Sequence, residues 1–193
     1  MFLSKLFSRR PQADAVADAL YALAVARARA PVFYRDLGVP DTLEGRFEMI
    51  SLHVYMLLRR LKQGADGSRA GGGAIGQALF DLMFADMDRN LREMGAGDLG
   101  VGRRVKAMAQ AFYGRIQAYD DGLAAGAEIL AQAVARNVYG GPDGGDAVPV
   151  SVDDGARALA AYLAASVAVL DAVSDDVLGQ GVAAFAPLPE AVS

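Results

Sequence analysis

The sequence predicts an all-α protein with a single globular helical domain of about six to seven helices. Apolar residues recur at spacings of three and four over most of the chain, which is the period of a helix buried on one face. We find no convincing alternation of apolar and polar residues that would indicate strands. At 193 residues, of which 53% are hydrophobic and 22% charged, the chain is long enough to bury one core.

Residues 1–12 are expected to form a flexible N-terminus. In this segment Phe and Leu residues alternate with Lys and Arg, so a helix here would have one apolar and one basic side. Two interpretations stay open: a frayed chain start, and a weak anchor that touches a membrane surface. Asp14 and Asp18 interrupt the hydrophobic stretch that a cleaved secretory signal needs, so no such signal is expected.

A proline and a capping sequence define the first two helices of the domain. The first covers about residues 13–30 and ends before Pro31, after which a turn segment follows. The second begins at Asp41 or Thr42, either of which can cap its first turn, and it ends near Lys62. Its apolar stripe predicts a buried face made of Phe47, Ile50, Val54, Leu57 and Leu61.

Two long helices are expected in the middle of the chain. The glycine-rich segment near 63–74 is predicted to be a mobile loop, and a third helix follows over about 75–94. A fourth helix starts at a cap, Asp98. The buried stripe of the third helix is Leu79, Met83, Met87 and Leu91, and that of the fourth is Val101, Val105, Met108, Phe112, Ile116 and Tyr119. On its outer side, the third helix carries two predicted i,i+4 ion pairs, Asp88–Arg92 and Arg89–Glu93.

The last third of the chain should hold three further helices. They cover about residues 123–138, about residues 152–170 and a short stretch capped by Ser174, with a second mobile loop near 139–151. The predicted organisation is therefore a flexible N-terminus, a helical domain over 13–182 and a loose C-terminal tail over 183–193.

The composition excludes several kinds of site. The chain has no cysteine and one histidine, so a disulfide scaffold, a thiolate zinc site, a cysteine nucleophile and a multi-histidine metal site are all excluded. A formal charge of −4 gives no general attraction to nucleic acid, and no DNA partner is expected. No segment approaches the roughly 20 apolar residues of a transmembrane helix. No cofactor and no catalytic set are expected.

A glycine motif in the middle of the chain resembles a dinucleotide-binding fingerprint. Gly95, Gly97 and Gly100 are spaced as G-x-G-x-x-G. That fingerprint should follow a strand and open a helix, whereas here a predicted helix precedes it. We therefore expect a turn between two helices.

Charged residues on two helices are candidates for recognition. Asp86 and Asp88 point about 200° apart on a helix, so they cannot share one ion without outside ligands. They fit better as part of a charged recognition face.

His53 has Arg46 seven residues before it and Arg60 seven after it, near one face of the second helix. Nearby cations would lower the pKa of the imidazole. This row fits either a binding site or a solvated or partly buried rim.

The methionines and aromatic residues form a set of apolar side chains, of which the methionines are flexible and polarisable. Two roles are open for this set: part of the core, and the lining of a groove that adapts to varied partners. The fourth helix has a basic side, which fits contact with RNA or lipid phosphate as well as a plain solvated face.

Two sequence blocks together resemble the ubiquinol–cytochrome c chaperone family. The first comprises residues 33–42 (FYRDLGVPDT), 45–47 and 52–53. The second comprises residues 77–80, 86–88, 91–95, 97–98, 101–102 and 111–115. The resemblance extends over roughly residues 17–180. The Ala- and Arg-rich composition and the lack of a convincing transit peptide suggest a bacterial form.

The resemblance implies an all-helical, non-enzymatic chaperone for assembly of the respiratory cytochrome bc1 complex. Its client would be newly made cytochrome b. Because mitochondrial members of the family also associate with the ribosome through a small partner protein, the ribosome and such a partner are further expected partners. The expected location is the cytoplasm, with peripheral contact at the cytoplasmic face of the inner membrane.

Six residues are predicted to form or support the client-recognition face: Tyr34, Arg46, His53, Asp86, Asp88 and Arg92. Two other function classes remain open. One is a helical small-molecule module for haem, quinone or lipid, with His53 as an axial ligand. The other is an enzyme that uses His53 with the neighbouring arginines.

Overall fold

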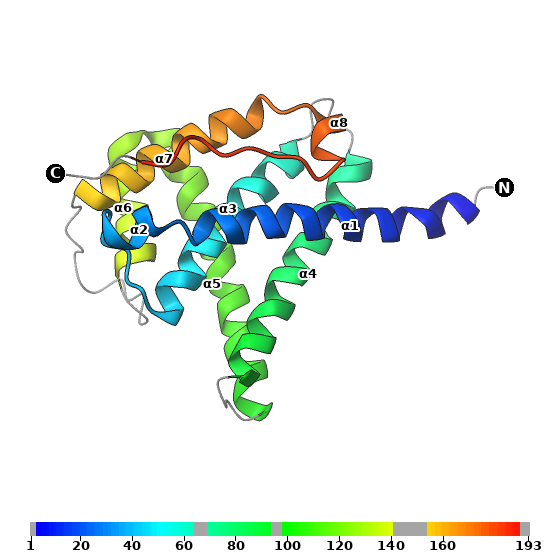
Figure 1. Ribbon diagram of the computed structural model, residues 1–193, viewed down its shortest axis with the longest axis horizontal. Helices are drawn as coiled ribbons and strands as arrows, with labels where there is room; N and C mark the ends of the chain where they lie inside the picture. Colours follow the sequence, from blue (N-terminus) through cyan, green and yellow to red (C-terminus); the bar gives the residue numbers. More distant parts are fainter. Residues whose placement is uncertain (1–2, 64–68, 94–97, 141–153, 190–193) are drawn as a thin grey trace.

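The computed structural model describes residues 3–63, 69–93, 98–140 and 154–189, and all regular elements in these ranges are helices (Figure 1). This confirms the predicted all-α class. The elements are α1 (Leu3–Ala28), α2 (Pro31–Arg35), α3 (Leu43–Gln63), α4 (Arg69–Glu93), α5 (Asp98–Ala125), α6 (Ala127–Val134), the π-helical turn η1 (Ala135–Tyr139), α7 (Asp154–Asp171) and α8 (Asp175–Leu178).

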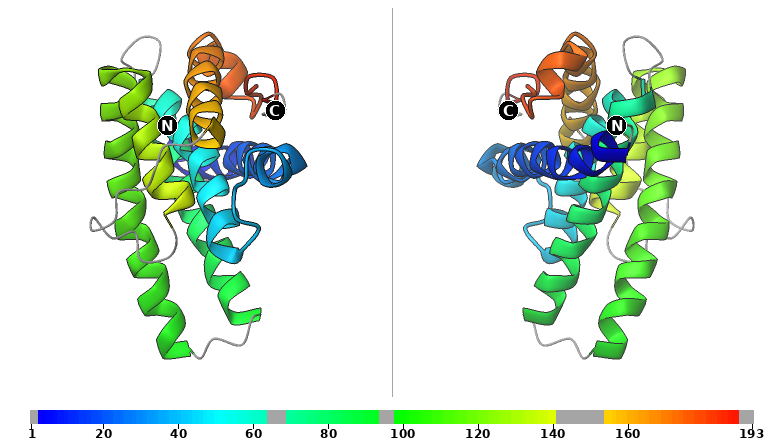
Figure 2. Two further views of the ribbon diagram at one scale, coloured as in Figure 1. Left: turned by 90° about the vertical axis from the view of Figure 1, so that its left-hand side faces the viewer. Right: turned by 90° about the vertical axis from the view of Figure 1, so that its right-hand side faces the viewer.

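Helix α3 lies at the centre of the molecule. It packs against α1, α4, α7 and η1, while α6 bridges α5 and α7. The predicted stripe of α3 is buried, and so are most residues between its members. A helix buried on nearly all sides forms the middle of a core rather than one of its edges. The long helices α4 and α5 extend together beyond this body, as Figures 1 and 2 show.

Several helix boundaries differ from those predicted. Helix α1 begins ten residues before the expected start, at Leu3. Pro31 opens α2 instead of a turn, because the fixed φ of proline suits a first helical position and Ala30 before it is extended. Helix α4 begins at Arg69, so part of the expected 63–74 loop is helical. The rest of that loop, and nearly all of the loop near 139–151, lie outside the described residues.

The break between α5 and α6 falls at Gly126, later than predicted. Gly126 has a φ of 116°, in the left-handed region that favours glycine. Just before it, a Cβ added at Gly122 would lie 2.8 Å from the Cα of Leu130, so α5 and α6 can approach this closely only with glycine there. The two glycines make a tight reversal.

Two predicted caps are confirmed. Thr42 Oγ1 accepts a hydrogen bond of 3.1 Å from the backbone N–H of Gly45, and Ser174 Oγ accepts one of 3.4 Å from that of Val177. Thr42, of the two residues considered, therefore caps the helix that carries Arg46. The start of α5 at Asp98 is also as expected.

The C-terminal tail differs from the loose segment that was expected. Residues 183–189 have no regular structure, but Ala186 is only 4% exposed. Its N–H donates to Ser166 Oγ over 3.1 Å, and its carbonyl oxygen accepts a hydrogen bond from Arg27. The segment is thus held by side chains of α7 and α1. Within the described ranges, no helix has the length and apolar character needed to cross a membrane.

Candidate partner-binding groove

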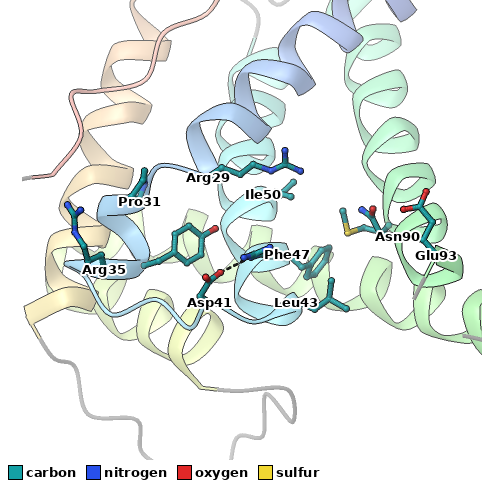
Figure 3. A pocket seen from close by; sticks show the side chains of 12 residues that line it. Arg29, Pro31, Arg35, Asp41, Leu43, Phe47, Ile50, Asn90 and Glu93 are labelled. Atoms are coloured by element: carbon teal, nitrogen blue, oxygen red, sulfur yellow. Dashed lines mark hydrogen bonds and ion pairs between the residues drawn. The ribbon is translucent and has the colours of Figure 1, made fainter. Parts of the chain in front are cut away.

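A groove of about 930 Å³ opens where α1 ends and α3 begins (Figure 3). Helix α2 and the loop after it form one wall, and the C-terminal half of α4 forms the other. The lining residues are Arg29, Pro31, Tyr34, Arg35, Asp41, Leu43, Arg46, Phe47, Ile50, Met87, Asn90 and Glu93.

The loop before α3 holds the groove in shape. A Cβ at Gly45 would lie 2.0 Å from the carbonyl oxygen of Pro40, so only glycine lets the loop close against the first turn of α3. Tyr34 donates from its hydroxyl to the carbonyl of Ala28 over 2.8 Å, which ties α2 to the end of α1. Tyr139 donates to the carbonyl of Leu37 over 2.9 Å from the other side. The wall is therefore held by a close backbone approach at Gly45 and by hydrogen bonds from two tyrosine hydroxyls to backbone carbonyls.

The rim of the groove is charged, and its arginines are on one side. Arg46 Nε lies 2.7 Å from Asp41 Oδ1, with both side chains mostly exposed. The hydrogen bond from Arg46 holds the pKa of Asp41 below its usual value. Arg35 pairs with its neighbour Asp36. Arg29, which is exposed, has no ion-pair partner among the described side chains. Exposed pairs of this kind add little stability and can exchange partners.

The floor of the groove is apolar. Phe47, Ile50 and Met87 are buried and Leu43 is partly buried, and Asn90 and Glu93 face them from α4 (Figure 3). An apolar floor within a charged rim is suited to an amphipathic segment, which places its apolar side chains inward and its charges at the edge. Methionine in the floor adds adaptability because its side chain is flexible and polarisable.

The structure separates the six predicted recognition residues. Tyr34 and Arg46 line the groove. Asp86 faces α1, where it accepts a 2.9 Å hydrogen bond from the Tyr21 hydroxyl and pairs with Arg89, so it joins two helices. Asp88 and Arg92 form the predicted exposed pair at 2.6 Å. These three residues of α4 lie beside the lining rather than in it.

Of the α4 residues that line the groove, Met87 belongs to the methionine and aromatic set for which groove lining was one open role, whereas Asn90 and Glu93 were not predicted. Met87, Asn90 and Glu93 follow one another at three-residue steps, a spacing that already places them on one side of a helix. Glu93 was instead expected to pair with Arg89, which pairs with Asp86 at i,i+3. The spacing was a usable signal, but it could not show which neighbouring helix this side faces.

His53 is fully buried, so it is not part of an exposed face. Arg60 is also buried and donates to the carbonyl of Leu170 over 3.1 Å. The seven-residue spacing does place these residues and Arg46 on the same side of α3. Beyond the first turn this side is covered by α7 and, around His53, also by Phe33 and Phe185. Of the two interpretations of this row, the solvated or partly buried rim is therefore wrong for His53 and Arg60, because both are buried.

A chain of hydrogen bonds determines which nitrogen of His53 carries the proton. Nδ1 lies 2.7 Å from the Met49 carbonyl oxygen, which can only accept, so Nδ1 is the donor. Nε2 then accepts from the Tyr162 hydroxyl at 3.0 Å, and the Tyr162 oxygen accepts from Arg27 Nε at 3.0 Å. Burial is the main cause that lowers the pKa of His53 to about 4, and Arg27 adds to it. The cations predicted to do this, Arg46 and Arg60, are not the cause.

Other chemistry expected or considered from the sequence finds little support in the geometry. Both nitrogens of His53 are engaged, so neither is presented to a haem iron. Among the described residues, no three His, Asp or Glu side chains are grouped so as to hold a metal ion. Gly95 and Gly97 lie outside the described residues and Gly100 lies in the first turn of α5, while α4 ends just before the motif; a helix therefore precedes it, as expected.

The fold and the groove define the class of protein: an all-α domain with an apolar groove inside a charged rim. More particularly, the chain belongs to the ubiquinol-cytochrome C chaperone family, whose model matches residues 35–185. The family resemblance inferred from the two sequence blocks is thereby confirmed.

Known relatives cover the chain to different extents. It is similar to the Cbp3 homologue from Brucella abortus, a bacterial protein, with a TM-score of 0.78, 36% identity and 97% of each chain covered. It is 30% identical to mitochondrial protein CBP3 of Saccharomyces cerevisiae over 82% of this chain and 45% of that one. For ubiquinol-cytochrome-c reductase complex assembly factor 1 of Xenopus laevis, the identity is 29% over 62% of this chain and 58% of that one. The chain spans about half the length of these two relatives.

Proposed function

We propose that the protein is an assembly chaperone for the cytochrome bc1 complex and that newly made cytochrome b is its client. The observation that carries this proposal is the family match over residues 35–185, supported by a likeness to a bacterial Cbp3 homologue along almost the whole chain. The relatives from Xenopus laevis and other animals are named as assembly factors of the same complex. In this proposal the protein binds its client and performs no chemistry on it.

The groove between α2, α3 and α4 is the proposed client site. A newly made membrane protein exposes apolar helices that water does not solvate well. The apolar floor offers contacts to such a helix through the partly exposed Leu43 and the small exposed parts of Phe47, Ile50 and Met87. Arg29 and Arg46 at the rim then meet acidic side chains or helix carboxyl ends of the client. Tyr34 keeps the wall in place through its bond to Ala28.

The remaining predicted recognition residues take supporting places in this proposal. Asp88 and Arg92 flank the groove on the outer side of α4 and extend its charged rim. Asp86 fixes α4 to α1 through Tyr21, and His53 fixes α3 to α7 through Tyr162. Substituting either of these two would alter client binding indirectly, through the shape of the groove.

The proposed place of action is the cytoplasmic face of the inner membrane, where cytochrome b enters the bilayer. Contact with the membrane would be peripheral. The ribosome or a small partner protein would bring the chaperone to its client during synthesis. Crosslinking in cells from a position on α4 would test this arrangement directly, because it should capture cytochrome b and any such partner.

Deletion of the gene tests the function itself. The expected result is a large loss of bc1 complex, measured from the reduced-minus-oxidised absorbance of b-type haem in membranes, and recovery when the gene is restored. Normal cytochrome b content in the deletion strain would refute the proposal.

Charge reversal at the rim tests the site. Arg29→Glu together with Arg46→Glu should abolish capture of cytochrome b in a pull-down, while circular dichroism and thermal unfolding stay as in the wild type. Arg136→Glu changes another exposed arginine, on η1 and outside the lining; it is the matched control and should keep full capture. If the double variant still captures cytochrome b, the client binds elsewhere.

A further inference from the structure

Helix α5 runs along one side of the molecule and carries the basic side noted in the sequence (Figure 2). Residues 99–119 contain four cations and no acid, in a chain whose net charge is −4. The structure divides these cations. Arg115 turns inward, where it pairs with the buried Glu48 of α3 and lies over the ring of Phe47. The other three are exposed: Arg103, Arg104 and Lys106.

The three exposed cations are not balanced by acids of the protein. Within the part of the chain that the structure describes, none of them forms an ion pair or a side-chain hydrogen bond. Arg46 and Arg60, in contrast, each lie against a carboxylate. Like charges three residues apart on a helix repel each other, so Arg103 and Lys106 add nothing to the stability of α5. Their charges are available to a negative partner.

A tyrosine extends the same exposed side of α5. Tyr113 is 61% exposed and lies ten residues after Arg103, which is about 15 Å along the helix and close to the same side. Its ring packs against Phe80 of α4, with centroids 5.7 Å apart, so it is supported from one side while most of it remains in solvent. We call the four exposed residues the α5 row: Arg103, Arg104, Lys106 and Tyr113.

The chemistry of the α5 row matches the surface of an anionic bilayer. Cations attract lipid phosphates, and a tyrosine ring, which is apolar with a polar tip, is suited to the headgroup layer. Single-stranded nucleic acid is instead bound by several exposed rings on which successive bases stack. Here the rings that surround Phe80 besides Tyr113 are Phe84 and Phe112, and both are buried. One exposed ring among cations therefore favours lipid over nucleic acid.

We propose that the α5 row is the surface by which the protein binds a bilayer that contains anionic phospholipid. The lipid phosphates lie against the three cations, and Tyr113 enters the headgroup layer. Because the rest of the chain is acidic on balance, the same bilayer repels it, and the protein binds in one orientation. This inference rests on the proposed place of action at the membrane. The client groove has no lining residue from α5, so lipid and client can be bound together.

Co-sedimentation of the full-length chain with lipid vesicles tests the surface. The wild type should sediment with vesicles of equal parts phosphatidylcholine and phosphatidylglycerol, and should stay in solution with vesicles of phosphatidylcholine alone. Replacing all three cations, by Arg103→Ala, Arg104→Ala and Lys106→Ala, should lower the partition coefficient about a hundredfold, at roughly fivefold for each cation. Alanine favours helix, so the circular dichroism of this variant should match that of the wild type.

A matched control removes the same kinds of charge elsewhere. Lys62→Ala, Arg136→Ala and Arg157→Ala together replace one exposed lysine and two exposed arginines outside α5, and this variant should bind nearly as well as the wild type. Equal loss of binding in the two triple variants would overturn the proposal, because net charge and not the α5 row would then be responsible. Undiminished binding by the α5 variant would also overturn it.

Fluorescence separates lipid from nucleic acid as the occupant. The chain has no tryptophan, so Tyr113→Trp places a single indole on the proposed surface. Its emission should shift to shorter wavelength when the anionic vesicles are added, because the ring leaves water, and should not shift with single-stranded RNA. A shift with RNA and none with vesicles would replace lipid by RNA as the partner, and the proposal would be wrong.

The vesicle experiments need neither cytochrome b nor the bc1 complex, so this inference and the proposed function can fail separately. A wild-type chain that captures cytochrome b but does not bind anionic vesicles would refute the lipid surface alone. If the chain binds vesicles through α5 while the deletion strain keeps normal cytochrome b, the lipid surface is upheld and the proposed function is refuted.

Discussion

The groove around Arg46 and the cluster around His53 lie two turns apart on the same helix, yet their polar groups have opposite surroundings. The Arg46 side chain is 62% exposed and shares one ion pair with an equally open carboxylate. The His53 side chain is fully buried and has both ring nitrogens bonded. One polar group is available to a partner, and the other is committed to the fold.

This difference shows how burial decides what a polar residue does. A buried polar group whose partner is removed still bears the free-energy cost of its desolvation. It must therefore be hydrogen-bonded in the folded state, and its bonding partners depend on it in turn. An exposed group is solvated in either case, so its pair adds little to stability. Changes at the groove should therefore affect binding, and changes at the cluster should affect folding.

The largest expected effect separates the two regions by stability. His53→Ala removes an aromatic ring from the core and leaves the Met49 carbonyl and the Tyr162 hydroxyl without their partner. We expect a loss of about 3 to 4 kcal/mol in the free energy of unfolding, from a cavity and unmatched polar atoms together. Urea denaturation at neutral pH measures it. A loss below about 1 kcal/mol would mean that the cluster does not hold the fold.

The pH dependence should sharpen the comparison further. The pKa of His53 is lowered from 6.5 to about 4 in the folded chain, so the unfolded state binds the proton more readily. The stability due to neutral His53 is present above pH 6.5 and is lost as the pH falls toward 4, by roughly 3 kcal/mol. Unfolding measured across this window should show the slope. His53→Gln should lack this part of it, and an unchanged slope in that variant would assign the effect to carboxylates.

A smaller effect should come from the edge of the cluster. Ser166→Ala removes the acceptor of the Ala186 N–H and should lower the free energy of unfolding by about 1 kcal/mol. Thermal unfolding of this variant beside Ala165→Gly, an exposed site on the same helix, separates the lost hydrogen bond from a change in helix propensity. If only the glycine variant is destabilised, the hydrogen bond between Ala186 and Ser166 contributes nothing to stability.

The smallest stability effect is expected at the groove. Arg46→Ala breaks an exposed pair and should change the free energy of unfolding by less than about 1 kcal/mol. The same variant should weaken capture of cytochrome b if the groove is the client site. A marked loss of stability here would remove the contrast between the two regions.

Local patterns predicted much of the fold. The stripes of α3 and α4, at Phe47, Ile50 and Met87 among others, are buried as expected, and the caps Thr42 and Ser174 hold the helices that they were predicted to begin. Helical period and capping depend on residues a few positions apart, so sequence carries this information directly. The α5–α6 boundary was harder to predict from sequence, because it depends on the close approach of Gly122 to Leu130.

Of the candidate site, sequence alone placed Tyr34 and Arg46, left Met87 open between core and groove, and missed Asn90 and Glu93. It also placed His53 in an open row, because a helical wheel shows which residues share a side and not what covers that side. Tyr162 and Phe185, which cover His53, are more than a hundred residues away along the chain. No local spacing encodes such a contact.

By itself, the sequence determined the helical class, the absence of cysteine chemistry, most of the buried stripes and the family. Only the tertiary structure decided that Arg46 is exposed while His53 is enclosed, that α4 supplies one wall of the groove, and that the C-terminal segment is held rather than loose. The reason is physical: helix formation is governed by neighbours in sequence, whereas burial, pKa and the shape of a groove are governed by neighbours in space.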